Sequence, residues 1–238
     1  FLKDWILRSE VSDALSKIYV RNIKTNKEEE LKITDEKVIS PGISIGQKDK
    51  DTNIIRISYD SPKTPSRTFE YNIETKEKKL LKEQIIPSGH NRDDYIVERL
   101  NCESHDGRQI PMTITFHKKT KLDGSAHVLL YGYGSYGMSM GPSFSSTRLS
   151  LINRNIIWVT CHIRGGMERG MRWWKEGKML NKKNTFSDFI SCVKFLIKKK
   201  YTSKKKIIAY GGSAGGLLLG STINQIPDLL LGAVMAVP

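Results

Sequence analysis

Long apolar runs, cysteine pairs and a leader-like start are all lacking from this sequence. No stretch approaches the roughly 18 uninterrupted apolar residues that a membrane-spanning helix needs. The first residues, 1–5, do not show the basic-then-apolar pattern of a secretory signal. The three cysteines, Cys102, Cys161 and Cys192, are odd in number and widely spaced, which argues against a disulfide framework and a zinc site. We therefore expect a cytoplasmic protein with buried, reduced thiols, no membrane partner, no metal and no cofactor.

Basic residues outnumber acidic ones, since 39 Lys and Arg against 25 Asp and Glu give a formal net charge of +14. Such a charge would suit nucleic acid or another anionic partner if it formed one patch. The lysine runs 198–200 and 204–206 flank an expected helix end and strand start, and the other lysines are scattered. Charge runs usually lie on a solvated face, so we expect a lysine-rich surface and no nucleic-acid partner. A non-catalytic basic protein that binds nucleic acid is kept as an alternative.

Residues 18–82 read as short strands separated by polar turns, which is typical of all-β structure. The expected strands are 18–20, 38–40, 54–59, 68–73 and 79–82. The last two form a meander hairpin of the kind found in propeller blades. The region is too short for a closed propeller of at least four blades, so a free-standing β domain is not expected.

Beyond Tyr95 the pattern changes to alternating strands and helices. The expected strands are 95–102, 110–117, 128–131, 156–161, 207–210 and 232–237, and the expected helices are 185–200 and 217–225. Thr185 and Asp188 are placed as a capping pair for the first of these helices. Compact apolar runs that alternate with amphipathic helices predict an α/β fold, with a mostly parallel sheet and helices on both faces.

Residues 211–215, Gly-Gly-Ser-Ala-Gly, match G-x-S-x-G between an expected strand and an expected helix, which is the context that the motif requires. A serine on such a turn exposes its hydroxyl above the carboxyl edge of the sheet, and only small neighbours let the backbone turn so sharply. The amide of Ala214 then points to the place where a tetrahedral oxyanion would form. Ser213 is therefore the predicted nucleophile, and a phosphate-binding or merely close-packed turn is the alternative.

A second glycine-rich loop, residues 132–137, follows an expected strand and formally matches the dinucleotide pattern G-x-G-x-x-G. That function needs a carboxylate about 20 residues on and a helix that opens at the loop. Residues 124–167 contain no acidic residue, and residues 138–142 do not open a helix. In a hydrolase the loop after the third strand supplies the second oxyanion donor, so we expect this loop beside Ser213. A plain surface turn is the alternative.

Arg164 leaves the next strand at the same edge of the expected sheet. We expect it to bind a carbonyl or carboxylate of the substrate, with a structural role as the alternative. Trp173 and Trp174 are expected to pack rather than to recognise a ligand.

Together these residues resemble the prolyl oligopeptidase family of serine peptidases, and within it the oligopeptidase B branch, which cleaves oligopeptides after Lys or Arg. The most specific segments are 131–137, 162–166 and 211–216. Ser135-Tyr136 and Ala214 favour that branch, because prolyl-specific relatives typically have Gly-Phe and Asn at these places. The resemblance implies an acyl-enzyme on Ser213, with the Tyr133 hydroxyl as a second oxyanion donor beside the Ala214 amide. It also implies that Tyr136 lies near the P1 side chain of an oligopeptide substrate.

The resemblance also implies how the chain is divided. Residues 60–66 look like the end of the family's propeller, and residues 95–100 look like the entry to its catalytic domain. By this similarity residues 1–86 are the C-terminal remnant of a β-propeller and residues 87–94 are a linker. Residues 95–238 would be the N-terminal part of an α/β-hydrolase catalytic domain, comprising its first six strands.

The acid and the base of the family's triad have no counterpart in this sequence. In the α/β-hydrolase fold they follow the nucleophile as Asp and then His, but all five histidines precede Ser213, and Asp228 follows it too closely. The carboxylates by which the family selects a basic P1 residue are also missing. A serine hydroxyl without a base is a weak nucleophile. We therefore expect a piece of a serine peptidase, truncated at both ends and inactive alone.

Two further alternatives remain open. In a split peptidase, a second chain would supply the missing strands, Asp and His, and would dock on the exposed sheet edge at residues 234–237. An esterase or lipase would share the hydrolase fold, but the propeller-like N-terminal region argues against it.

Overall fold

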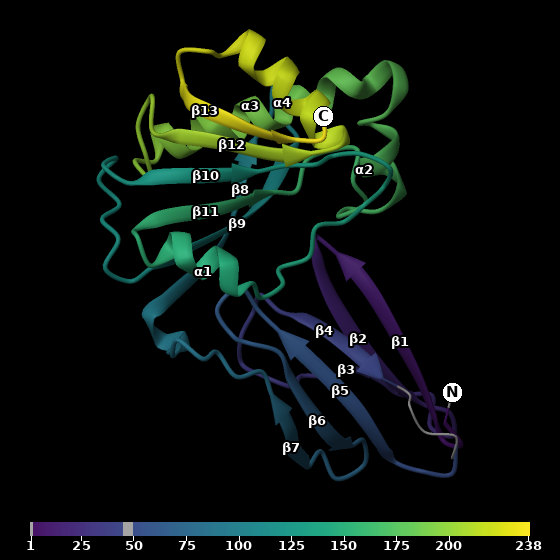
Figure 1. The fold of residues 1–238 in the computed structure, drawn as a ribbon. Coiled ribbons are helices and arrows are strands. Elements are labelled where there is room, and N and C mark those ends of the chain that lie inside the picture. The colour runs from purple at the N-terminus through teal and green to yellow at the C-terminus, as the bar shows by residue number, and fades with distance from the viewer. Residues whose placement is uncertain (1, 45–49) are drawn as a thin grey trace. The chain divides into compact units, whose positions relative to one another are not determined.

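The computed structural model describes residues 2–44 and 50–238. The chain divides into two compact units. The first comprises Phe1–His90 with Gly141–Ser145, and the second comprises Asn91–Met140 with Ser146–Pro238. Within the described residues the first unit is built of strands, whereas the second combines strands and helices (Figure 1).

Two antiparallel sheets make up the first unit (Figure 1). One sheet has the order β1 (Trp5–Ser12), β2 (Leu15–Asn22) and β3 (Glu28–Glu30). The other has the order β4 (Ser40–Ser44), β5 (Ile54–Asp60), β6 (Arg67–Asn72) and β7 (Lys78–Glu83). Neighbours in each sheet are consecutive in the chain, so both are meanders, and the predicted hairpin of β6 with β7 is confirmed. The sequence did not predict β1.

Alternating side chains build the core of the first unit. One buried cluster takes in alternate side chains of three strands: Ile18 and Val20 on β2, Ile55, Ile57 and Tyr59 on β5, and Phe69 on β6. The Tyr59 and Phe69 rings stack with centroids 5.9 Å apart. This period of two is the one expected for strands that bury one face.

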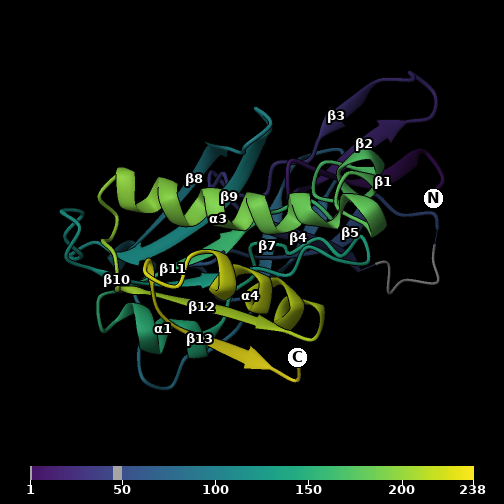
Figure 2. The same ribbon diagram turned by 90° about the horizontal axis from the view of Figure 1, so that it is seen from above.

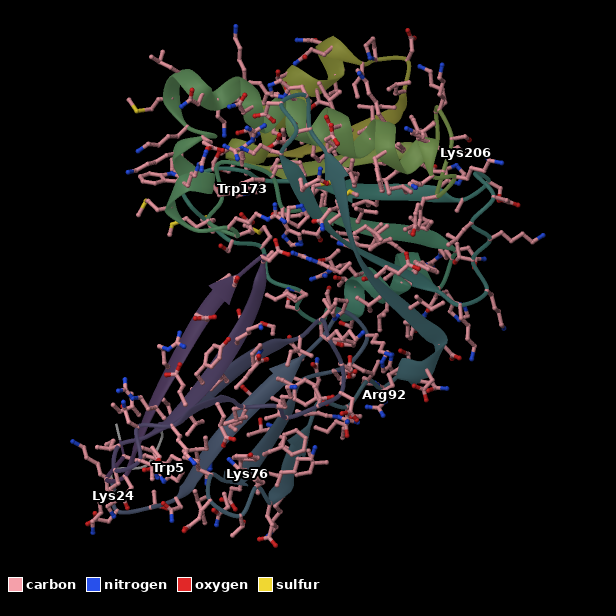
Figure 3. The ribbon with its side chains drawn as sticks, turned by 180° about the vertical axis from the view of Figure 1, so that it is seen from behind. Trp5, Lys24, Lys76, Arg92, Trp173 and Lys206 are labelled. Atoms are coloured by element: carbon pink, nitrogen blue, oxygen red, sulfur yellow. The ribbon has the colours of Figure 1, made fainter. Side chains whose placement is uncertain are left out.

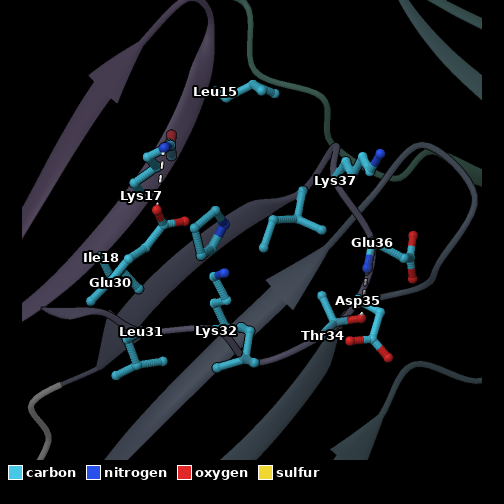
Figure 4. A pocket seen from close by; sticks show the side chains of 14 residues that line it. Leu15, Lys17, Ile18, Glu30, Leu31, Lys32, Thr34, Asp35, Glu36 and Lys37 are labelled. Carbon is cyan, nitrogen blue, oxygen red and sulfur yellow. Dashed lines mark hydrogen bonds and ion pairs between the residues drawn. The ribbon is translucent and has the colours of Figure 1, made fainter.

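A hollow of about 490 Å³ lies beside β2 and the segment that follows β3 in the first unit (Figure 4). Lys17 and Glu30 form an ion pair of 3.2 Å in its lining. Lys32, Asp35 and other residues of both charge signs complete the lining. The hollow therefore offers no charge of a single sign to a ligand.

One six-stranded sheet organises the second unit, in the order β13-β12-β10-β11-β9-β8. Its strands are β8 (Tyr95–Glu103), β9 (Gln109–His117), β10 (His127–Tyr131), β11 (Ile156–Cys161), β12 (Ile207–Gly212) and β13 (Leu230–Ala236). Strands β11, β10, β12 and β13 run parallel, and β9 pairs antiparallel with both β11 and β8. The predicted α/β fold with six hydrolase strands is therefore confirmed.

Helices cover both faces of this sheet. On one face, α3 (Lys182–Lys198) and α4 (Ala214–Gln225) pack together (Figure 2) and share a core with the buried side chains of the strands. Helix α1 (Ser146–Ile152) packs against β11 on the other face, where the Arg148 guanidinium lies 5.1 Å from the Trp158 ring centroid. The short elements are the 3-10 turns η1 (Arg92–Asp94) and η2 (Met179–Asn181), and helix α2 (Met171–Lys175). None of the helices in the described residues combines the length and the apolar character needed to span a bilayer.

The start of α3 differs from the sequence prediction. The helix begins at Lys182 after the N-cap residue Asn181, one turn before the predicted start, so the assignment of Thr185 and Asp188 as a capping pair is wrong. Both side chains are fully buried and bond to the loop after β11 instead of to the helix amides. A Thr-x-x-Asp pattern is equally compatible with an inward-facing polar pair, and the sequence contains no signal that separates the two.

Basic side chains are spread over both units, and several have acidic neighbours (Figure 3). In the first unit Lys24 pairs with Asp4 at 3.0 Å, and Lys76 pairs with Glu29. In the second unit Lys206 donates to the Ser125 carbonyl at 3.0 Å. This distribution fits the predicted scattered, lysine-rich surface.

Candidate active site

Ser213 lies on the turn that joins β12 to α4 (Figure 1). Its backbone has φ 51° and ψ −120°, a combination that costs energy for a residue with a side chain. Two backbone hydrogen bonds hold the turn: the Ser213 amide donates to the Ala236 carbonyl at 2.9 Å, and the Gly216 amide donates to the Ser213 carbonyl at 2.7 Å. The Ser213 side chain is exposed and does not cap the helix. The strained turn thus presents an exposed hydroxyl at the carboxyl edge of the sheet.

Two glycines of this turn are required by the close approach of the loop after β10. A Cβ atom on either Gly211 or Gly215 would lie 3.0 Å from the Gly132 carbonyl oxygen. Such a distance is tighter than ordinary van der Waals contact, so a larger residue would force the loop away. The spacing of the motif is therefore explained by backbone packing.

The same approach brings Tyr133 to the turn that carries Ser213, called the Ser213 turn below. A Cβ atom on Gly215 would lie 3.7 Å from Tyr133 Cδ2, which is van der Waals contact. The loop is anchored at its start by the Gly132 amide, which donates to the Tyr210 carbonyl at 3.2 Å, and it turns through positive φ values at Gly134 and Tyr136. The Tyr136 side chain is 78% exposed. The predicted site residues Tyr133 and Ser213 thus lie on adjoining segments.

Ala214 is the first residue of α4. The first amides of a helix have no acceptor within the helix, and the positive end of the helix dipole lies there. The Ala214 N–H therefore has the electrostatic character needed to stabilise an oxyanion beside Ser213.

Arg164 does not have the environment of a substrate-binding residue. Its side chain is 1% exposed, and its Nε and Nη2 donate to the Asp188 carboxylate at 2.8 and 2.6 Å. Its Nη1 donates to Asp106 at 2.5 Å. Burial opposes the charge, but the hydrogen bonds that Arg164 donates to Asp188 and Asp106 outweigh it and raise the pKa of Arg164. The predicted contact with a substrate carbonyl or carboxylate is therefore wrong, and the structural alternative holds.

The Arg164 ion pair holds the loop after β11, which adjoins the loop that carries Tyr133. The Thr185 hydroxyl donates to the Arg164 carbonyl at 2.9 Å. A Cβ atom on Gly165 would overlap the Gly134 carbonyl oxygen, so only glycine fits there. Asp188, which the sequence analysis assigned to a helix cap, is thus a buried support of the candidate site. The burial of Asp188 in the structure shows this supporting role, which the helical pattern of the sequence does not indicate.

None of the four histidines of the second unit is placed to act on Ser213. His127 begins β10 and His117 ends the antiparallel strand β9, so both lie at the amino edge of the parallel strands. His105 lies in the turn between β8 and β9, three strand spacings or about 14 Å from β12. The His162 ring is fully buried and bonds through Nε2 to Thr113 at 2.8 Å, and burial lowers its pKa well below the usual value.

A serine on a strained turn between a parallel strand and a helix, within a sheet covered on both faces, defines the α/β-hydrolase class. Two family models match the chain: "Prolyl oligopeptidase family" over residues 142–238, and "Prolyl oligopeptidase, N-terminal beta-propeller domain" over residues 1–84. The chain therefore belongs to the prolyl oligopeptidase family.

Individual relatives agree with this assignment. The chain is 41% identical over 210 residues to dipeptidyl aminopeptidase BI of Pseudoxanthomonas mexicana, with 88% of the chain and 29% of that protein covered. It is 41% identical over 194 residues to protease 2 of Moraxella lacunata, with 82% and 28% covered. The structure of oligopeptidase B from Trypanosoma brucei with covalently bound antipain superimposes with a TM-score of 0.89 at 30% identity, covering 98% of the chain and 34% of that protein. The chain thus spans about a third of the length of these relatives.

Proposed function

We propose that the protein is a serine-type endopeptidase of the oligopeptidase B kind, which hydrolyses oligopeptides after Lys or Arg through an acyl-enzyme on Ser213. The observation that carries the proposal is the backbone of Ser213, which is held at φ 51° with its side chain exposed and Tyr133 on the adjoining loop. A strained residue whose side chain takes no part in helix capping or core packing is characteristic of a functional position. The relatives that the chain resembles include proteins named protease 2 and oligopeptidase B.

The proposed reaction is acyl transfer in two steps. The Ser213 Oγ forms a bond to the scissile carbonyl carbon while its proton passes to a base, and the carbonyl oxygen becomes an oxyanion. The Ala214 N–H and the Tyr133 O–H donate to that oxyanion. The C–N bond then breaks. The leaving amine takes the proton back from the base, and the acyl group remains on Ser213 as an ester. Water hydrolyses the ester by the same route and releases the second product.

The base is proposed to be a histidine from outside residues 1–238, oriented by an aspartate that is also outside them. The placement of His105, His117, His127 and His162 supports this, because none of them reaches the Ser213 turn. Residues 1–238 by themselves are then expected to be inactive, since the serine hydroxyl stays protonated near neutral pH.

The exposed strand β13 favours a second candidate, the split peptidase. Within the described residues β13 pairs only with β12, and its Leu231, Val234 and Met235 side chains are exposed. A second chain that adds strands there would bring its own acid and base. Mixing residues 1–238 with the C-terminal part of the Moraxella protease 2 tests whether this edge accepts such a partner. Arginyl ester hydrolysis above that of either piece supports docking at β13, and no gain argues against it.

The proposed preference for a basic P1 residue is tested with matched chromogenic substrates. The protein expressed from its complete coding sequence should hydrolyse an arginyl or lysyl anilide with a kcat/KM about 100-fold above that of the prolyl anilide, because a desolvated charge pair discriminates strongly. The support for this preference is the pair Ser135-Tyr136 together with Ala214. The prolyl anilide serves as the matched control, and a preference for it would place the protein among the prolyl-specific enzymes.

Replacing Tyr133 by phenylalanine removes one proposed oxyanion donor and leaves the ring that lies beside the Ser213 turn. We expect Tyr133→Phe to lower kcat by about 100-fold to 1,000-fold with little change in KM, as for the loss of one oxyanion donor. Steady-state kinetics of the purified variant measure this. Tyr136→Phe removes a hydroxyl from the same loop and is the comparison for kcat alone, because Tyr136 gives no donor to the oxyanion and its proposed place near the P1 side chain would affect KM. Equal kcat values for Tyr133→Phe and the wild type would remove Tyr133 from the reaction.

The domain limits and the location also remain proposals. We place the propeller part in residues 1–86, a linker in residues 87–94 and the catalytic part in residues 95–238, supported by the division of the structure between His90 and Asn91. Limited proteolysis with cuts in residues 87–94 would support these limits.

A cytoplasmic location is supported by three buried cysteines that are free thiols, and cell fractionation tests it.

A further inference from the structure

Lys182 contacts the Tyr133 loop, residues 132–137, but belongs to neither the Ser213 turn nor the Arg164 ion pair. Its Nζ donates to the Gly134 carbonyl and to the Ser135 hydroxyl oxygen, both at 2.6 Å. Lys182 is the first residue of α3, so its backbone is fixed by a long packed helix. The side chain therefore connects a rigid element to the carbonyl that follows Tyr133 in the chain.

The environment of Lys182 is unusual for a lysine. The side chain is half-buried and burial lowers its pKa, with no contribution from a carboxylate in the described part of the chain. Lysines usually remain in solvent or pair with an acid when they lose solvent. A cation that is partly desolvated to reach two neutral acceptors indicates that the contact itself is important for the protein.

The loop that Lys182 contacts depends on such a contact for its shape. Gly134, Tyr136 and Gly137 all have positive φ values, so the loop follows a path that few sequences adopt unaided. Its far end is closed by the Gly137 amide, which donates to the Gly165 carbonyl at 2.9 Å. Lys182 bonds to Gly134 and Ser135, which lie between Tyr133 and the Gly137–Gly165 hydrogen bond.

We propose that Lys182 is a positioning residue of the peptidase reaction, which fixes the Gly134 carbonyl so that the Tyr133 hydroxyl stays directed at the oxyanion. This inference rests on the proposed function and adds a residue to it. Lys182 acts through Tyr133 and does not touch the substrate. An oxyanion donor is effective only when it is preorganised, so a loop that moves by about 1 Å loses much of its effect on rate.

The kinetic test compares Lys182→Met with Lys183→Met in the protein expressed from its complete coding sequence. Lys183 is the next residue of the same helix and is exposed, which makes it a matched control. We expect Lys182→Met to lower kcat for an arginyl anilide by about 100-fold with KM changed less than about twofold. Lys182→Arg keeps a donor and should recover part of the loss. A kcat of Lys182→Met equal to that of the wild type would overturn the proposal.

A double-mutant cycle separates positioning from a general structural role. In the Tyr133→Phe background the same Lys182→Met change should cost less than about threefold, because the donor that Lys182 positions is already gone. A full 100-fold loss in that background would show that Lys182 acts independently of Tyr133 and would overturn the proposal. Ser213→Ala, measured in parallel, tests the proposed function itself. A failure of the proposed function can therefore be told apart from a failure of the Lys182 proposal.

Hydrogen exchange tests the holding contact without any assay of hydrolysis. The Gly137 and Met138 amides donate to Gly165 and Ser135 carbonyls at 2.9 and 3.0 Å. In Lys182→Met these amides should exchange faster, whereas in Lys183→Met they should exchange at the wild-type rate. Unchanged exchange in Lys182→Met would overturn the holding role even in a protein that hydrolyses no peptide.

Discussion

Ser213→Ala is expected to abolish peptide hydrolysis, lowering kcat by about a million-fold while the protein stays folded. The Ser213 hydroxyl is the atom that attacks in the proposed reaction, and its removal leaves only oxyanion binding and substrate binding. The measurement is kcat for an arginyl anilide in the protein expressed from its complete coding sequence. The folded state is checked by thermal unfolding, because the side chain is exposed and caps nothing.

The control for this prediction is Ser221→Ala, which removes a hydroxyl from the same helix. Among the residues that the structure describes, the Ser221 Oγ accepts from the exposed Gln225 amide alone, at 3.0 Å, so this change should leave kcat within about twofold of the wild type. Hydrolysis by Ser213→Ala at more than about a thousandth of the wild-type rate would show that another group carries the reaction. The acyl-enzyme on Ser213 would then have to be abandoned.

Asp188→Ala is expected to destabilise the second unit by about 3–5 kcal/mol. Asp188 is fully buried and its two oxygens accept from the Arg164 side chain at 2.6 and 2.8 Å. Removing Asp188 leaves the buried Arg164 guanidinium with the part-exposed Asp106 as its remaining carboxylate partner and takes away the acceptor of the Ser104 hydroxyl, so the cost approaches that of breaking a buried ion pair. Urea unfolding followed by tryptophan fluorescence measures the loss, since Trp158, Trp173 and Trp174 all belong to the second unit.

Asp106→Ala is the matched control, because it removes the other carboxylate that bonds to Arg164. The Asp106 side chain is 35% exposed, so solvent can replace it, and we expect a loss of at most about 1 kcal/mol. Equal losses for the two variants would contradict the view that burial of Asp188 makes the difference. A small loss for both would mean that the ion pair does little to hold the loop after β11.

The sequence predicts the parts of this fold in which local pattern and burial coincide. The expected strand 156–161 coincides with β11, and the G-x-S-x-G motif places Ser213 correctly at a strand-to-helix turn. In both cases the residues themselves dictate the structure, since buried parallel strands need continuous apolar runs and a sharp turn needs small residues.

Contacts between distant segments account for what the sequence did not predict. Arg164 and Asp188 are 24 residues apart, and the sequence alone assigned the first to substrate binding and the second to a helix cap. Lys182 lies in a lysine-rich stretch, yet it contacts a loop 48 residues earlier in the chain. Such pairs are selected by the tertiary arrangement, and no periodicity or propensity records them. Helices α1 and α2 were missed for a different reason. With seven and five residues, they are too short to show a helical pattern in the sequence.

The backbone of Ser213 has a consequence for engineering this protein toward heat resistance. Glycine tolerates φ 51° and ψ −120° far better than serine does, so a glycine at this position would relax the turn. A screen that rewards thermostability alone would therefore tend to eliminate Ser213, the proposed nucleophile. Libraries built on this scaffold should keep position 213 constant and seek their gains elsewhere.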